Sequence, residues 1–191
     1  MGELTIDADL EHFHLIPKPC VTSVFWEIRD VDPDIDPRFE KEEWFSSTLL
    51  EWGRCGKLIA QEGEGLAFAQ YAPATLFPRL EEFPAAAGSS VSAAYLAYCF
   101  VVEGFRGRSL GSRLVREVAR DLVDRGYSAV EAIGDREWAG DSWVLPFQFL
   151  AANEFSVVRE HPRFPLLRRE LRDVLEPARA LAEATAQAPS P

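Results

Sequence analysis

Apolar residues recur with two clear spacings in the middle of the chain. Within residues 107–125, four apolar side chains lie four positions apart, which is the spacing of one face of an α-helix: Leu110, Leu114, Val118 and Leu122. Gly126 follows and predicts the end of that helix. The preceding stretch Ala93–Val102 is almost continuously apolar, as is the short run Ala129–Ile133. Such runs are typical of strands buried on both faces, so the order predicts a crossover between two parallel strands.

The N-terminal half shows weaker patterns of the same two kinds. Leu4–Ile6 and the β-branched and aromatic run Val21–Ile28 predict strands. Phe39–Trp52 carries apolar residues at helical spacing and predicts a helix after an acidic, proline-rich loop. Lys57–Ala60 and Leu66–Tyr71 are apolar runs separated by a glycine-containing turn, which predicts a hairpin.

The C-terminal region completes the predicted sheet. Phe147–Asn153 predicts a helix, and Phe155–Val158 and Leu166–Leu171 predict two closing strands. Together these elements predict an α/β fold of mixed α+β type, in which helices flank a central mixed β-sheet. We expect one domain over residues 1–175. The segment 176–191 is rich in Ala and Pro and predicts a flexible tail.

The composition excludes several classes of function. A chain of 191 residues with 47% apolar residues and five Trp suits one globular domain. The formal net charge of −11 disfavours a nucleic-acid partner, which needs clustered Lys and Arg. The negative charge either attracts cationic ligands such as amines or serves solubility. No apolar run approaches the roughly 18 residues of a membrane span. The three Cys form no C-x-x-C pair, so neither a disulfide framework nor a metal site is expected. We expect a cytoplasmic protein, and the heavy use of Ala and Arg hints at a bacterial source.

The turn between the predicted central strand and its helix carries the most informative residues. Arg106, Gly107, Arg108 and Ser109 lead into a first helical turn that contains Gly111. The first turn of a helix presents unpaired N–H groups and the positive end of the helix dipole, and glycines let the backbone approach a ligand. Such a site suits a pyrophosphate. The patterns G-x-x-x-x-G-K-[ST] and G-x-G-x-x-G, which mark nucleotide-binding loops, are both absent.

With its strand and helix, this turn resembles the GCN5-related N-acetyltransferase (GNAT) superfamily, whose motif [RQ]-x-x-G-x-[GA] follows the central strand. Arg106 takes the first place and Gly111 the last, while Ser109 stands where the first Gly is expected. The resemblance covers residues 57–171, whereas the divergent N-terminal residues 1–56 match little. It implies the GNAT-like acyl-CoA N-acyltransferase fold. It also implies transfer of acetyl from acetyl-CoA, or of another acyl group from its acyl-CoA, to an amine by direct attack.

The resemblance also implies which residues bind the acyl-CoA. The end of the central strand would pair with the pantetheine arm, and the turn and helix start would hold the pyrophosphate: Phe100, Val101, Val102, Arg106, Gly107, Arg108, Ser109, Leu110, Gly111 and Ser112. Other family positions depart from the pattern. Leu150 replaces a Tyr that often acts as general acid, Trp143 replaces an Asn, and Glu154 replaces a Gly.

Two residues are candidates for proton transfer. Tyr95 lies where family members often carry a carboxylate base. Tyrosine is a poor base at its ordinary pKa, so Tyr95 would order a water there, or it is an aromatic residue of the core. Glu131 lies within a short apolar strand, where an unpartnered carboxylate is costly. It therefore lines the active-site cleft, pairs with an Arg, or lies at an exposed strand end.

Two other functions stay open at this point. One is a non-catalytic, CoA-binding regulatory module on the same fold. The other is a protein-interaction domain, which would expose Trp26, Trp44 and Trp52. The expected partners are an acyl-CoA and a cationic amine acceptor, carried by a small molecule or a protein. A homodimer is left open.

Overall fold

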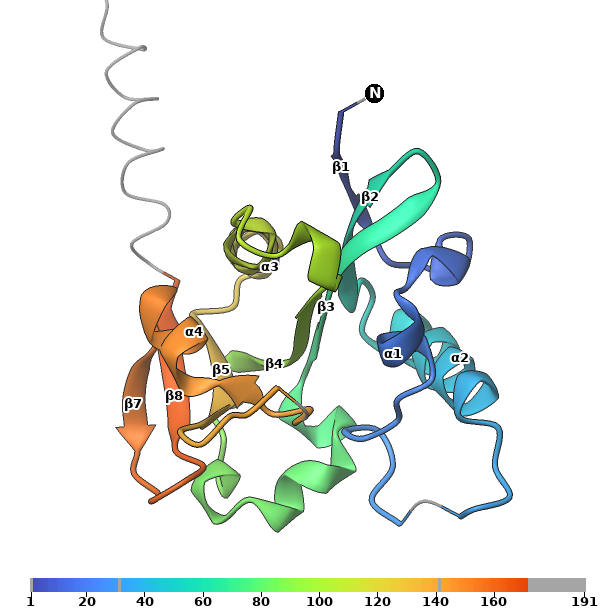
Figure 1. Cartoon of the computed structure of the whole chain (residues 1–191). Helices are drawn as coiled ribbons and strands as arrows, with labels where there is room; N and C mark the ends of the chain where they lie inside the picture. The colour runs from blue at the N-terminus through green and yellow to red at the C-terminus, as the bar shows by residue number, and fades with distance from the viewer. Residues whose placement is uncertain (1, 31, 141, 172–191) are drawn as a thin grey trace, which may run out of the picture.

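The computed structural model describes residues 2–30, 32–140 and 142–171, and one mixed β-sheet lies at its centre (Figure 1). The strands of these residues follow the order β1-β2-β3-β4-β5-β8-β7, with β6 paired beside β5. The strands are β1 (Leu4–Asp7), β2 (Gly56–Gln61), β3 (Glu64–Ala72), β4 (Ala93–Val101), β5 (Ala129–Asp135), β6 (Leu145–Pro146), β7 (Ser156–Arg159) and β8 (Leu166–Glu170). The α-helices are α1 (Lys18–Val21), α2 (Pro37–Glu51), α3 (Leu110–Asp124) and α4 (Phe147–Ala152). The mixed sheet flanked by helices, which the sequence predicts, is confirmed.

Helices cover both faces of this sheet (Figure 1). On one face, α3 and α4 bury Leu114, Leu122 and Leu150 against the strands. On the other face, α1 and α2 pack with Trp26 and Phe45 in a second core. Three short 3-10 helices add to that second core: Ala74–Leu76, Pro78–Glu82 and Pro84–Ala86. The sheet therefore separates two apolar cores, one of which contains the helix that follows the predicted phosphate-binding turn.

The predicted strand, helix, strand crossover is confirmed. β4 and β5 pair in parallel, and α3 connects them. The helix begins at Leu110, because Gly107 and Ser109 both adopt left-handed backbone with φ of 77° and 60°. After the helix ends at Asp124, Gly126 has a φ of 82°. This is the left-handed position past a helix end that favours glycine.

The strand β4 separates from β5 partway along its length. Their pairing stops at Tyr95 and Glu131, while β5 continues and pairs with β6. On its other side, β4 has one extra residue, Ala97, because Leu96 and Tyr98 face consecutive residues of β3. This bulge places Tyr95 and Tyr98 in the same core, although their spacing would put them on opposite faces of a regular strand. The second half of β4 therefore has one open edge.

The strand predicted for Val21–Ile28 is wrong. Val21 ends α1, and the residues that follow form turns in which Trp26 is fully buried. The guanidinium of Arg79 donates hydrogen bonds to three carbonyl groups of this region: Phe25, Ile28 and Arg29. These contacts satisfy the backbone without a strand partner, so the strand propensity of the segment is overridden by tertiary packing.

The three Trp that an interaction domain would expose pack inward instead. Trp26 is fully buried. Trp44 donates a hydrogen bond to the carbonyl of Leu76 at 2.9 Å, and Trp52 donates one to the hydroxyl of Tyr127 at 2.7 Å. Both are partly buried against the cores. They do not form the exposed aromatic surface that this alternative requires.

Other predicted elements are confirmed with shifted ends. The helix α2 begins at Pro37, because the carboxylate of Asp36 accepts hydrogen bonds from two N–H groups of its first turn. The hairpin formed by β2 and β3 is present, as are α4, β7 and β8. The predicted domain end at residue 175 and the predicted tail 176–191 lie outside the described residues. Among the residues described, no helix has the length and apolar character needed to cross a bilayer.

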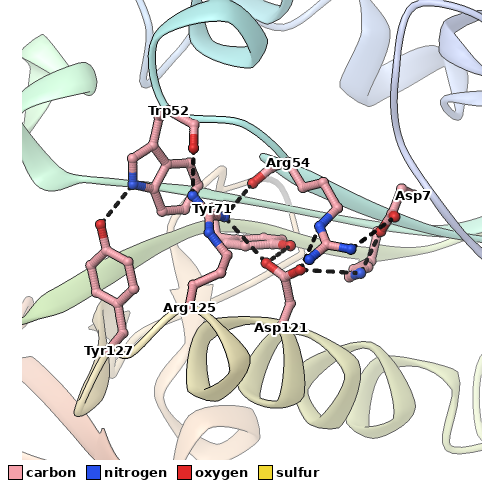
Figure 2. Close-up of polar contacts among 8 residues, drawn as sticks. Asp7, Trp52, Arg54, Tyr71, Asp121, Arg125 and Tyr127 are labelled. Carbon is pink, nitrogen blue, oxygen red and sulfur yellow. Dashed lines mark hydrogen bonds and ion pairs between the residues drawn. The ribbon is translucent and has the colours of Figure 1, made fainter.

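The buried carboxylate of Asp121 fastens the last turns of α3 to the sheet (Figure 2). It accepts a hydrogen bond from the Tyr71 hydroxyl of β3 at 2.8 Å. It also pairs with Arg54 at 2.8 Å and with Arg125 at 3.2 Å. The guanidinium of Arg125 in turn lies over the Trp52 ring, 3.6 Å from its centroid. This cluster fixes α3 relative to β3 and to the segment that follows α2.

Candidate active site

A cavity of about 960 Å³ lies beside the open edge of β4. One wall comes from the end of β4 and the turn after it, and consists of Tyr98, Cys99, Phe100, Val102, Glu103, Phe105 and Arg106. A second wall is formed by Trp138, Gly140 and Ser142–Pro146. A third wall is the N-terminal segment His14–Pro19 together with the turn between β2 and β3. The cavity thus begins where β4 and β5 part.

Next to this cavity, six successive backbone N–H groups lack a partner. The N–H groups of residues 107–112 make no hydrogen bond with any residue that the structure describes, and the first bonded amide is that of Arg113. Three of the six belong to the turn and three to the first turn of α3. Unpaired amides at a helix start, together with the positive end of the helix dipole, form an anion site. The prediction that this turn leaves its amides free is confirmed.

Two arginines add positive charge at the same turn. Arg106 is exposed and donates a hydrogen bond to the carbonyl of Val101 at 3.3 Å. Arg108 lies over the Phe105 ring, with 5.2 Å between its guanidinium carbon and the ring centroid. Arg108 also forms a long ion pair with Glu3 at 3.9 Å. Both arginines belong to the turn that carries the unpaired amides. Arginine next to free N–H groups suits a phosphate oxygen, because both donate to it.

The structure changes the role of three residues of the helix start. Ser109 stands at the N-cap position, but its hydroxyl makes no capping hydrogen bond. Gly111 is buried, and a methyl group at this position would lie 3.0 Å from the Phe149 ring. Its small size therefore serves the packing of α3 on α4, and not the approach of a ligand. The side chain of Leu110 is in the core, so Leu110 offers only its N–H group.

The three strand-end residues predicted to bind the pantetheine arm differ in the direction and hydrogen bonding of their backbone peptide groups. The N–H of Val102 donates to the carbonyl of Leu66 at 2.9 Å, and its carbonyl accepts from the N–H of Phe105 at 2.9 Å. The backbone of Val102 is therefore occupied, which corrects that prediction for its peptide groups. Peptide groups alternate along a strand, so those of Phe100 also point to β3. Val101 is the residue of the three whose peptide groups point to the open edge.

The two residues predicted for proton transfer lie away from the cavity. Tyr95 is buried among aromatic residues of the core, and its hydroxyl accepts a hydrogen bond from the N–H of Ile133 at 3.3 Å. Burial raises the pKa of Tyr95 above that of a free phenol. Glu131 is the register partner of Tyr95 and forms an ion pair with Arg168 at 2.9 Å. The structure brings the two together, but neither lines the cavity.

Cys99 does line the cavity, and its surroundings make it unreactive. Its thiol points to the carbonyl of Gly111, with 3.6 Å between sulfur and oxygen. Burial raises the pKa of Cys99 to about 12. Because the thiolate is the nucleophilic form, this raised pKa disfavours Cys99 as an acyl-accepting nucleophile at neutral pH.

The model of the Acetyltransferase (GNAT) family matches residues 21–138 of the chain. The matched span is more than half of the chain, and it contains β4, the turn with the unpaired amides, and α3. The chain belongs to the acetyltransferase (GNAT) family. Its activity is acyl-CoA-dependent N-acetyl transfer, as the motif at Arg106–Gly111 predicts. No curated protein matches the sequence of this acetyltransferase.

Solved structures of acetyltransferases share the fold. An N-acetyltransferase from Staphylococcus aureus Mu50 has a TM-score of 0.62 at 12% identity, over 90% of this chain and 100% of that one. PaiA N-acetyltransferase from Thermoplasma acidophilum, solved with coenzyme A, has a TM-score of 0.56 at 10% identity, over 89% and 99%. YhbS from Escherichia coli, also solved with coenzyme A, has a TM-score of 0.52 at 16% identity, over 90% and 82%. At these identities the likeness concerns the fold of the acetyltransferase alone.

A polar cluster behind the cavity wall was not predicted from the sequence. Tyr98 lines the cavity, and its hydroxyl lies 3.3 Å from the carboxylate of Glu27. Glu27 forms an ion pair with Lys41, which is fully buried. One signal was present in the sequence: Glu27 is the charged residue of the run Val21–Ile28. Its meaning was hidden, because the run was expected to be a strand.

Proposed function

We propose that this acetyltransferase binds acetyl-CoA along the open edge of β4 and transfers the acetyl group directly to a primary amine. The observation that carries the proposal is the row of unpaired N–H groups at 107–112, which adjoins a strand edge without a neighbour. Those amides, with Arg106 and Arg108, suit the pyrophosphate. The N–H of Val101, which points to the open edge of β4, suits a carbonyl of the pantetheine arm. Acetyl-CoA supplies the acyl group as a thioester, at the end of the cavity lined by Tyr98.

Direct attack is supported by the state of the cysteine in the cavity. A mechanism through an acyl-enzyme needs a nucleophile with a base beside it. Cys99 has a raised pKa and a carbonyl oxygen as its hydrogen-bond partner, so it does not meet that need. The remaining role of the protein is to orient the thioester, exclude water and remove a proton from the amine.

The cavity suits an acceptor whose primary amine is attached to an apolar or aromatic group. The cavity walls away from β4 carry mostly apolar side chains: Leu15, Ile16, Pro17, Pro19, Trp138 and Trp143. Charged residues of both signs, Lys18 and Arg106 against Glu64 and Glu103, line it as well. The lining therefore lacks the excess of acidic groups that a polyamine would require. An ammonium group against aromatic faces is also favourable.

Binding of the donor is tested by thermal unfolding with coenzyme A. A ligand that binds only the folded state at about 100 times its Kd stabilises it by about 2.7 kcal/mol, so Tm rises with added coenzyme A. We expect the double variant R106A/R108A to lose most of this rise. The matched control is R120A, because Arg120 is an exposed arginine of α3 that lies beyond the turn and pairs with Glu117. Equal shifts in all three proteins would contradict the assigned pyrophosphate site.

Transfer is tested by the release of free coenzyme A thiol from acetyl-CoA in the presence of amines. The amines are phenethylamine, spermidine and an N-terminal alanine peptide, each at the same concentration. We expect phenethylamine to give the highest kcat/KM. Faster turnover of spermidine would show that the acceptor is a polycation and that the apolar lining does not select it.

We also propose that residues 1–175 form one domain, because the described residues before β2 contribute Phe13, Trp26 and Phe45 to a core shared with the sheet. A cytoplasmic location is proposed as well. It is supported by the three unpaired cysteines Cys20, Cys55 and Cys99, since free thiols are typical of a reducing compartment.

A further inference from the structure

A charged pair lies fully inside the protein, directly behind the wall of the cavity. Lys41 of α2 and Glu27 of the segment after α1 are in contact, and both side chains are almost completely inaccessible to solvent. Gln70 of β3 donates a hydrogen bond to the same carboxylate and accepts one from Lys41 at 3.1 Å. A buried ion pair usually contributes little to stability, because the loss of hydration offsets the attraction between the charges. Its presence beside a cavity therefore calls for another reason.

Tyr98 connects this pair to the cavity. Its hydroxyl lies 3.3 Å from one carboxylate oxygen of Glu27 and 3.1 Å from the hydroxyl of Ser23. The ammonium of Lys41 lies 4.3 Å from the centroid of the Tyr98 ring. On the cavity side, Trp143 packs edge-on against the same ring at 5.6 Å. The hydroxyl also lies 3.4 Å from the carbonyl oxygen of Ser23. The ring is therefore held on several sides, and Tyr98 lies between the cavity and a buried carboxylate.

We propose that Tyr98 is a catalytic residue of the acetyl transfer, and that it passes a proton from the acceptor ammonium to Glu27. This inference rests on the proposed function, because it needs the thioester and the amine to meet at the Tyr98 end of the cavity. Lys41 and Gln70 are positioning residues. They hold the carboxylate of Glu27 toward Tyr98 and act on the substrate only through it.

The transfer balances in protons and bonds. The ammonium gives one proton to the Tyr98 oxygen, while the Tyr98 hydroxyl proton moves to Glu27. The free amine nitrogen then bonds to the acyl carbon, and the bond between that carbon and the sulfur of coenzyme A breaks. The nitrogen loses its second proton to the leaving thiolate, which departs as the thiol. Glu27 finally returns its proton through Tyr98 to solvent, so one proton is released for each amide formed.

The ionisable groups around Glu27 and Lys41 are consistent with proton transfer through Tyr98. Ionisable groups that face Tyr98 and Glu27 are Lys41 from α2 and Cys20 from α1, and Cys55 lies near Lys41. Burial lowers the pKa of Lys41, which the carboxylate of Glu27 opposes. Burial and the charge of Glu27 raise the pKa of Tyr98 well above its ordinary value. Tyr98 therefore stays a neutral hydroxyl, which accepts one proton only as it gives up another.

The first test removes the Tyr98 hydroxyl and keeps its ring. General acid–base groups contribute about 100-fold or more to rate, so we expect Tyr98→Phe to lower kcat for phenethylamine by roughly 100-fold. The KM for acetyl-CoA should stay within about twofold, because the ring is retained. Tyr71→Phe is the matched control. Tyr71 also donates to a buried carboxylate, that of Asp121 (Figure 2). It does not line the cavity. Equal kcat in Tyr98→Phe and Tyr71→Phe would overturn the proposal.

The pH dependence separates proton removal from a structural role. In Tyr98→Phe only amine that is already deprotonated reacts, so its kcat/KM should rise about tenfold per pH unit between about pH 7 and 9. The wild-type profile should be flatter over the same range. Hydroxylamine is neutral at pH 7 and needs no deprotonation before attack. The variant should therefore approach wild-type rates with hydroxylamine, and an equal loss with both nucleophiles would overturn the relay.

The second test addresses Glu27. Glu27→Gln keeps its shape but cannot accept the proton, so we expect the same loss of kcat and the same steep pH profile as in Tyr98→Phe. This single variant leaves Lys41 without its counter-charge and can unfold the protein. The double variant E27Q/K41M removes both charges and restores the balance. Recovery of wild-type kcat in the folded double variant would show that Glu27 is structural, which overturns its assigned role.

Coenzyme A binding distinguishes a failure of the proton relay from a failure of the proposed function. If wild type and Tyr98→Phe both gain stability from coenzyme A and only the variant loses transfer, the relay is supported. If both bind coenzyme A and transfer acetyl at equal rates, the relay is wrong and the proposed function stands. If wild type does not bind coenzyme A, the proposed site fails first and the relay fails with it.

Discussion

Replacing Gly65 by Ala changes the contact that holds the N-terminal segment against the cavity. Gly65 is the second residue of β3, at the turn that forms part of the cavity wall. A methyl group built at its Cα would lie 1.8 Å from the carbonyl oxygen of Leu15. The atom it meets belongs to the backbone, so rotating a side chain does not relieve the clash. Either the turn between β2 and β3 or the segment His14–Pro19 has to move.

The cost follows from what anchors that segment. Phe13 and Ile16 are 4% and 3% exposed, so both are core residues next to the point of contact. Overpacking a well-packed site costs about 1–3 kcal/mol, and withdrawing one such side chain from the core costs about 1.5–3 kcal/mol. Because a shift of the segment withdraws these residues only in part, we expect Gly65→Ala to lower the free energy of unfolding by about 2–4 kcal/mol. The KM for the amine should also rise, because His14–Pro19 lines the cavity.

Urea denaturation followed by tryptophan fluorescence measures the loss. Gly104→Ala is the matched control, since a methyl group there meets no atom within 4 Å and Gly104 does not adopt left-handed backbone. We expect this control to change the free energy of unfolding by no more than about 0.5 kcal/mol, as is usual for surface substitutions. A Gly65→Ala protein as stable as the Gly104→Ala protein would refute the close contact with Leu15.

Three further outcomes follow from the same structure. Asp121→Asn should lower the free energy of unfolding by about 2–3 kcal/mol, because it removes the charge from a buried carboxylate. The control Glu117→Gln, in an exposed ion pair of the same helix, should lower it by less than about 1 kcal/mol. Urea denaturation measures both values. Alkylation of Cys99 by iodoacetamide should be slow at pH 8, and its rate should rise with pH toward the Cys99 pKa of about 12. Coenzyme A should protect Cys99 from alkylation, because Cys99 lines the cavity. Fast labelling of Cys99 at pH 8 would contradict the buried thiol. Gly107→Ala places a side chain at a φ of 77°, which costs about 1–2 kcal/mol. We expect the free turn to relax and relieve this strain, so that coenzyme A has to restore it on binding, and calorimetry should show roughly tenfold weaker binding. Unchanged affinity would show that the turn does not hold coenzyme A.

The catalytic candidates show where sequence reasoning stopped. Counting back from Arg106 along a regular strand pointed to Tyr95, which the structure places in the core. The bulge at Ala97 turns Tyr98 to the same core and into the cavity wall. A one-residue insertion leaves no mark on the apolar pattern of a strand that is buried on both faces, because every position is apolar in any register. Of the three alternatives for Glu131, the structure shows the pairing with an Arg, namely Arg168. The sequence could not decide among them, because this pairing depends on β8 lying beside β5.

The sequence by itself determined the centre of the fold. The i, i+4 spacing of α3, the glycine that ends it and the apolar runs on either side are local signals, and they place the turn with the unpaired amides between Val101 and Leu110. Only the tertiary structure decided which residues lie behind the cavity wall. Glu27 and Lys41 come from segments far from β4 in the chain, and they meet Tyr98 only after α2 and the segment 21–28 have packed on the sheet. Short-range periodicity records which residues share a face, whereas a buried ion pair depends on how separate elements dock.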